Sequence, residues 1–336
     1  MKPRLLLHVG APKTGTTTLQ HACDASRQAL LACGILYPAV DLNPEPPKHQ
    51  WLTRPHDFER FASNVLAVAE QARVSRAAHV ILSCEGLFNQ WFDVSAAGRS
   101  ALAALNDRFD VTIWVVFREP VSWAMSLYVQ TVKTQAVHLP KPSSTSEPPE
   151  AAIAHEYFAT RLRYDRFVQD VESVFGEGTV HIMRYESGDI LEQARRFLGI
   201  DATVLASAGN KNKALSTLGV ELLRRLNSLA IAAEERRRIV SQIIELDKTL
   251  GASSGPIRPS DEFRSKVLAL SRDSEGYLEQ RFGIGWADCR DDATAARRVA
   301  PPDGKTCAPS DLDIRHQGIG ITQTRGVLRI QSNGFR

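Results

Sequence analysis

Residues 5–20 combine three local signals in a fixed order. The apolar run Leu5-Leu6-Leu7 is followed by a turn rich in glycine and threonine, and then by residues with a helical pattern. A short strand, a tight turn and a helix in this order wrap backbone N–H groups around a phosphate at the helix N-terminus. The segment therefore predicts a phosphate-binding loop between a strand and a helix.

The position of the lysine in this loop is unusual. The loop that binds nucleoside triphosphates, G-x-x-x-x-G-K-[ST], carries its lysine directly after the second glycine. Gly10 and Gly15 keep that spacing, but Thr16 stands in place of the lysine, and Lys13 lies upstream. We expect this displacement to put the ammonium on the leaving side of the bound group and to remove the usual kinase geometry.

Two segments resemble a known family. Residues 12–17 (PKTGTT) are similar to the 5′-phosphosulfate loop of sulfotransferases that use PAPS (3′-phosphoadenosine 5′-phosphosulfate). The second segment, REPVSWAMSLY, begins at Arg118 directly after the apolar run 111–117. In the family, an arginine and a serine eight residues later grip the 3′-phosphate, which implies these roles for Arg118 and Ser126. The resemblance covers roughly residues 4–282 and, with GILYP at 34–38 after the first helix, is nearer to bacterial and glycan-type members. Leu19 departs from the cytosolic members, which often carry an aromatic residue there.

The resemblance implies PAPS as co-substrate, PAP as product and no metal. A fixed ammonium and backbone donors can stabilise a leaving phosphate without magnesium, and Lys13 is placed to bond the bridging oxygen. Lys213, in a segment similar to one that closes over the cofactor phosphates, is a further candidate. The other donors expected from the loop are Thr14, Gly15, Thr16, Thr17 and Thr18.

The acceptor must lose a proton as it attacks, so a general base is required. Glu85 follows the apolar run 79–83 in the sequence SCEG, which resembles the strand-end Ser-x-Glu of glycan and protein sulfotransferases. His49 is the alternative, because cytosolic small-molecule members use a histidine. Glu186 also matches a strand end of the family, and we interpret it as structural.

The alternation of strands and helices along the chain predicts a central parallel sheet covered on both faces, and the resemblance implies a three-layer α/β/α fold of the P-loop nucleotide-binding type. Apolar, β-branched runs at 4–9, 79–83, 111–117 and 179–184 predict strands, and helical spacing recurs at 61–72, 96–105 and 158–175. Residues 215–282 are helical in pattern throughout. We expect one domain over 1–285 with a mobile loop at 136–150, and an irregular linker and tail over 286–336 with some strand-like alternation.

Composition limits the classes of function. A net charge of +3 is too small to suggest nucleic acid, and the sequence has no run of eighteen apolar residues that would span a membrane. Five scattered cysteines without C-x-x-C spacing predict free thiols and no metal site. From these features we expect a cytoplasmic location.

The sequence thus predicts a sulfotransferase that transfers a sulfonyl group from PAPS to a hydroxyl or amine of a carbohydrate or other small polar acceptor. Two alternatives stay open, a small-molecule kinase that uses ATP and a non-catalytic nucleotide-binding protein. Acceptor identity would depend on the loops at 41–55 and 136–150, which carry no recognisable pattern.

Overall fold

The computed structural model describes residues 2–134, 142–206, 214–250, 255–289, 319–324 and 327–332. Contacts divide the chain into two compact units, Met1–Cys289 and Arg290–Arg336. Lys213 and residues 136–141 of the predicted mobile loop lie outside the described residues. The boundary after residue 285 and the mobility of 136–150 therefore stay predictions.

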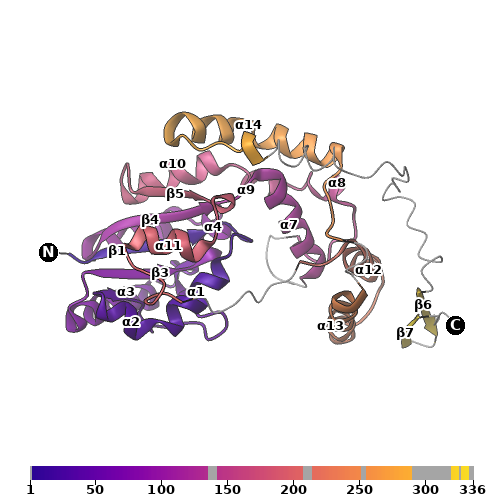
Figure 1. Ribbon diagram of the computed structural model, residues 1–336, viewed down its shortest axis with the longest axis horizontal. Coiled ribbons are helices and arrows are strands. Elements are labelled where there is room, and N and C mark those ends of the chain that lie inside the picture. The colour runs from indigo at the N-terminus through magenta and orange to yellow at the C-terminus, as the bar shows by residue number, and fades with distance from the viewer. Residues whose placement is uncertain are drawn as a thin grey trace. The chain divides into compact units, whose positions relative to one another are not determined.

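A parallel five-stranded sheet forms the centre of the first unit (Figure 1). Its spatial order is β2-β3-β1-β4-β5, with every neighbouring pair parallel. The strands are β1 (Arg4–Gly10), β2 (Ile35–Leu36), β3 (His79–Ser83), β4 (Asp110–Phe117) and β5 (Val180–Arg184). The four predicted strands are confirmed, and β2 is too short for its two residues to show a pattern in the sequence.

Helices cover both faces of this sheet, so the predicted α/β class is confirmed. On one face, Leu6 and Trp114 belong to an apolar cluster with Leu19 of α1 (Thr16–Ala25) and Ile190 of α11 (Ile190–Leu198). On the other face, the ring of Phe117 lies 6.1 Å from that of Phe88 in α4 (Glu85–Trp91). The Phe88 ring in turn packs 4.9 Å from Phe167 of α10 (Tyr164–Phe175).

Further helices extend these two layers. α14 (Asp261–Phe282) lies along α10 and also contacts α7 (Pro120–Lys133), and α7 contacts α12 (Thr217–Asn227) (Figure 1). α12 packs on α13 (Ala233–Leu250). The remaining helices are α2 (Arg27–Ala32), η1 (Gln50–Thr53), α3 (Phe58–Ser75), α5 (Ala96–Ala103), α6 (Leu105–Arg108), α8 (Pro149–Ala152), α9 (Glu156–Arg161) and η2 (Tyr185–Ser187).

One helical prediction needs correction. The segment 158–175 is not one helix, because α9 ends at Arg161 and α10 begins at Tyr164. The helical pattern over 215–282 corresponds, among the described residues, to α12, α13 and α14. In the second unit, β6 (Ile319–Thr324) and β7 (Val327–Ser332) form an antiparallel pair, with Ile319 opposite Ser332.

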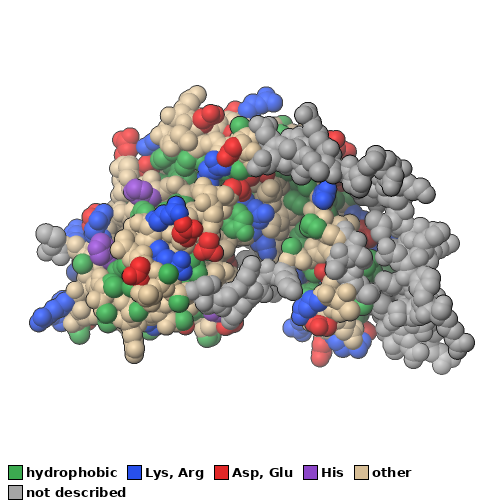
Figure 2. Space-filling model, in the orientation of Figure 1, with side chains coloured by type: hydrophobic (Ala, Val, Ile, Leu, Met, Phe, Trp, Pro, Cys, Tyr) green, Lys and Arg blue, Asp and Glu red, His purple; other side chains and the backbone are tan. Residues whose placement is uncertain are grey.

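Two further features concern the charges on the surface and the polarity of the helices. Lys, Arg, Asp and Glu side chains are interspersed over the face shown in Figure 2. Across the part of the chain that the structure describes, every helix is too short or too polar to cross a membrane.

Candidate active site

The loop between β1 and α1 has the backbone of an anion-binding turn. Lys13 and Gly15 both adopt left-handed conformations, with φ of 71° and 78°. Left-handed residues within such turns are typical of backbone nests that bind anions. The Thr14 hydroxyl donates a 2.6 Å hydrogen bond to the carbonyl oxygen of Ala11, which braces the turn from within. Lys13 lies exposed in this loop, whereas the Thr14 and Thr16 side chains are buried.

Gly10 sets the close approach of strand and helix at this loop. A Cβ atom there would lie 2.2 Å from Cγ2 of Thr16 and 3.0 Å from Oγ1 of Thr14. These distances are too short for any side chain, so the loop requires glycine at this position. Thr17 and Thr18 are half-buried in the first turn of α1, where helix N–H groups have no intrahelical partner.

Arg118 lies against the same loop, although it is 105 residues away in the chain. Its Nη1 donates a 3.3 Å hydrogen bond to the carbonyl oxygen of Lys13. Its guanidinium also lies 4.9 Å from the centre of the Tyr185 ring, and its Nε is buried without a hydrogen-bond partner among the described residues. The carboxyl ends of β1 and β4 therefore bring both predicted phosphate-binding segments together.

The helix that follows Arg118 is fixed at its start by carboxylates. Glu119 caps α7 by accepting a 2.7 Å hydrogen bond from the Ser122 N–H, and Pro120 occupies the first turn. Glu186 accepts from the Glu119 N–H at 2.9 Å and from Trp286 Nε1 at 3.2 Å, which agrees with the structural role expected for it. Ser126 lies half-buried in the second turn of α7.

Glu85 is the first residue of α4 and lies directly beyond the end of β3. Its Oε2 accepts a hydrogen bond from the hydroxyl of Thr16, so the carboxylate contacts the phosphate loop. Its Oε1 lies 3.7 Å from Nζ of Lys48, with the two side chains 25% and 17% exposed. Glu85 is thus held between the loop and a lysine while keeping access to solvent.

His49 occupies a different environment. Its side chain is fully buried, Nδ1 accepts the Ser83 N–H at 3.1 Å, and Nε2 bonds the Pro38 carbonyl oxygen at 3.0 Å. Burial lowers the pKa of His49 from 6.5 to about 4, so the ring is neutral at pH 7. Both ring nitrogens are therefore engaged with backbone groups in this conformation.

A second buried histidine lies beneath the loop. His8, opposite Ser83 in the β1–β3 register, places Nδ1 2.8 Å from the Ser83 hydroxyl, which also accepts from Gln20 at 3.1 Å. Burial lowers the pKa of His8 to about 3. This neutral cluster ties β1, β3 and α1 together below the phosphate loop.

Sequence reasoning missed two residues of this site. Lys48 directly precedes His49, and no pattern marks its pairing with Glu85. Tyr185 is 37% exposed and follows β5, and its ring lies beside both Arg118 and Gly15. An aromatic residue directly after a strand run was the available signal in the sequence. Within the described ranges, no three His, Cys, Asp or Glu side chains gather as a metal site.

The likenesses found among known proteins are to solved structures. No protein-family model and no curated protein matches the chain. Among solved structures, it is similar to a sulfotransferase from Alicyclobacillus acidocaldarius, with 15% sequence identity and a TM-score of 0.36. The match covers 81% of this chain and 96% of that chain.

Proposed function

We propose that this protein is a sulfotransferase that uses PAPS and transfers its sulfonyl group to a hydroxyl or amine of a carbohydrate or other small polar acceptor. One observation carries the proposal. The hydrogen bond from Arg118 to the Lys13 carbonyl oxygen joins two segments, each of which alone predicts a phosphate grip. A nucleotide phosphorylated at both the 5′ and 3′ positions needs two such phosphate-binding segments at one site.

The residues present fit this nucleotide. The loop at 13–18 would hold the 5′-phosphosulfate through backbone N–H groups, hydroxyls and the Lys13 ammonium. The Arg118 guanidinium is suited to a phosphate monoester, and its buried, unpartnered Nε is a donor that such an anion would satisfy. Ser126 and Lys213 remain candidates for the 3′-phosphate and for closure over the phosphates. Tyr185 would line the same nucleotide site beside Arg118.

In the reaction, PAPS supplies the sulfur: the acceptor oxygen or nitrogen forms a bond to it, the bond to the bridging oxygen breaks, and PAP leaves with that electron pair. Lys13 would stabilise the charge that develops on the leaving phosphate, which is electrostatic preorganisation. Glu85 would take the proton of the acceptor. Because the contact of Oε1 with Lys48 is loose at 3.7 Å, that oxygen is the one we assign to receive the proton.

We assign the base to Glu85 rather than His49. Glu85 is partly exposed and contacts the phosphate loop, whereas both nitrogens of the buried His49 bond backbone groups. His49 instead holds the segment that carries Lys48 against the end of β3. In this proposal it is a positioning residue.

One contact favours a second candidate, a kinase that uses ATP and magnesium. In P-loop NTPases, a loop Ser or Thr and a strand-end acid hold Mg²⁺. The bond between Thr16 and Glu85 places such a pair at this loop. The upstream position of Lys13 and the second grip at Arg118 favour the sulfotransferase.

Turnover of ³⁵S-labelled PAPS in the presence of a magnesium chelator separates the two candidates. We expect release of PAP and transfer of label to an acceptor from a panel of sugars and phenols. Lys13→Gln should lower this turnover by roughly a hundredfold or more, on the scale of losing one preorganised charge-stabilising donor. Magnesium-dependent consumption of ATP, with PAPS left intact, would support the kinase instead.

A further inference from the structure

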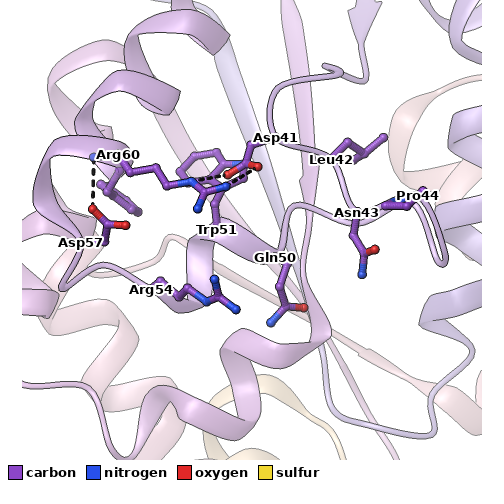
Figure 3. Close-up of a pocket in the computed structure, with 10 residues that line it drawn as sticks. Asp41, Leu42, Asn43, Pro44, Gln50, Trp51, Arg54, Asp57 and Arg60 are labelled. Atoms are coloured by element: carbon purple, nitrogen blue, oxygen red, sulfur yellow. Dashed lines mark hydrogen bonds and ion pairs between the residues drawn. The ribbon is translucent and has the colours of Figure 1, made fainter.

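A cavity of about 340 Å³ lies beside the site (Figure 3). Its walls come from the loop after residue 40, from η1, from the segment between η1 and α3, and from the first turn of α3. The lining residues are Asp41, Leu42, Asn43, Pro44, Gln50, Trp51, Arg54, Asp57, Arg60 and Phe61. Its volume is at the small end of the range for ligand pockets, about 300–1,000 Å³. It therefore suits a small molecule or the terminal unit of a larger one.

This cavity is connected to Glu85 through the segment 48–50. His49 is paired with Ser83 in both directions, since its own N–H donates to the Ser83 carbonyl oxygen at 2.9 Å. On one side of this anchor, Lys48 reaches Glu85. On the other side, Nε2 of Gln50 would lie 3.4 Å from a Cβ atom at Gly86. The cavity wall at Gln50 therefore abuts the residue next to the proposed base.

Most charges in the cavity already have partners. Asp41 accepts two hydrogen bonds from the Arg60 guanidinium, at 2.9 and 2.8 Å, and a third from Asn64 at 3.2 Å. These bonds lower the pKa of Asp41, and the bond from Arg60 lowers it most. The carboxylate therefore stays ionised and bonded to Arg60. Asp57 caps α3 by accepting from the Arg60 N–H at 3.4 Å.

Arg54 differs from these residues. Its exposed guanidinium makes no hydrogen bond or ion pair with the side chains and carbonyl groups that the structure describes, and its charge acts on Asp41 only as the smallest of the causes that lower the pKa of that carboxyl. In Figure 3 it points toward Gln50 and away from the pair formed by Asp41 and Arg60. A guanidinium that makes no hydrogen bond or ion pair among the described residues and lies beside amide groups is suited to a planar carboxylate. It can bind that carboxylate with two parallel hydrogen bonds.

One wall of the cavity is apolar. Trp51 and Phe61 are buried, and their rings pack edge to face at a centroid distance of 5.3 Å. These two rings form an apolar part of the lining, and a ring-shaped acceptor could contact them while its polar groups face Gln50, Asn43 and Arg54. The cavity thus combines an apolar wall with two arginines, of which Arg60 is already paired with Asp41.

We propose that this cavity is the acceptor site and that the acceptor is a hydroxylated ring that carries a carboxylate, which Arg54 binds. The inference rests on the sulfotransferase proposal for the role of Glu85. The carboxylate would lie at Arg54, and a hydroxyl of the ring would lie toward Gln50 and Glu85. Arg54 would then select acceptors by charge.

Matched pairs of acceptors test this directly, because an amide has the shape of a carboxylate without its charge. The probes are methyl glucuronide with methyl glucuronamide, and para-hydroxyphenylacetate with its amide, added to protein saturated with PAP. We expect NMR titration of the full-length protein to show the acid of at least one pair binding roughly tenfold more tightly than its amide. Arg54→Gln should remove this preference, and Arg54→Lys should keep part of it.

Arg76→Gln is the control, since Arg76 is an exposed arginine at the other end of α3. It should keep the preference for the acid. Equal binding of acid and amide in both pairs, or a preference that survives in Arg54→Gln, would overturn the inference while leaving PAP binding intact. An Arg54-dependent preference in a protein that does not bind PAP would support the cavity and contradict the sulfotransferase proposal.

Discussion

The carboxylate of Glu85 has one oxygen on the Thr16 hydroxyl and the other near the Lys48 ammonium. Glu85→Gln can keep the bond from Thr16 but cannot accept a proton. We expect it to lower turnover of labelled PAPS by roughly 10²–10⁴-fold and to leave PAP affinity nearly unchanged. Glu70→Gln, on the exposed surface of α3, is the matched control. A fully active Glu85→Gln protein would move the base elsewhere.

The two buried histidines predict how stability depends on pH. Burial holds the pKa of His49 at about 4 and that of His8 at about 3, below the ordinary value of 6.5. The unfolded chain therefore binds these protons more readily, and the stabilisation is complete above pH 6.5 and is lost as the pH falls from there. Each histidine contributes a slope of up to about 1.4 kcal/mol per pH unit to the free energy of unfolding.

His49→Gln isolates one of these contributions. Urea unfolding between pH 6.5 and 4 should show a slope that is smaller than in the wild type by up to about 1.4 kcal/mol per pH unit, whatever the change in absolute stability. An unchanged slope would mean that His49 is not a buried neutral group.

The residues of the site differ in how far the sequence alone predicts their roles. Lys13, Glu85 and Arg118 could be selected because their segments resemble those of sulfotransferases and lie after strand runs, and parallel strands end at one edge. The burial of His49 could not be predicted, because it depends on pairing with Ser83, 34 residues away. The ion pair of Lys48 with Glu85 is likewise a tertiary contact with no local pattern.

The close approach of β1 and α1 at Gly10 gives a prediction about the stability of these two elements. Gly10→Ala should destabilise the protein by about 1–3 kcal/mol, because its Cβ would overlap the Thr16 methyl group at 2.2 Å. It should also weaken PAP binding, since Thr16 belongs to the loop. Gly276→Ala in α14 is the control: its Cβ meets no atom within 4 Å, and we expect a gain of about 0.5–1 kcal/mol. Thermal unfolding that shifts alike in both variants would contradict the argument.

Elements differ in how far their sequence predicts them. Apolar runs predict β1, β3 and β4 because strands buried on both faces are continuously apolar, whereas β5 is buried only at Val180. The break between α9 and α10 was not predicted, because apolar spacing continues across it. Asp165, in the first turn of α10, accepts from Arg163 and from Ser274 of α14. A contact with a helix more than a hundred residues away thus fixes where α10 begins.

At the scale of the whole molecule, alternation of strands and helices was enough to predict the parallel α/β class. The strand order was not predictable, and it is this order that places β1 between β3 and β4. The phosphate loop, Glu85 and Arg118 therefore meet at one edge of the sheet. The proposed acceptor cavity depends on the same topology, because the segment that lines it is paired to the end of β3.

Calorimetry with PAP tests the central claim most directly. Without magnesium, we expect PAP to bind with micromolar or tighter affinity and ATP to bind much more weakly. Arg118→Ala should cost about 2–4 kcal/mol of PAP affinity and barely change the affinity for adenosine 5′-phosphosulfate, which has no 3′-phosphate. Equal losses for both ligands, or tight binding of ATP that requires magnesium, would contradict the account.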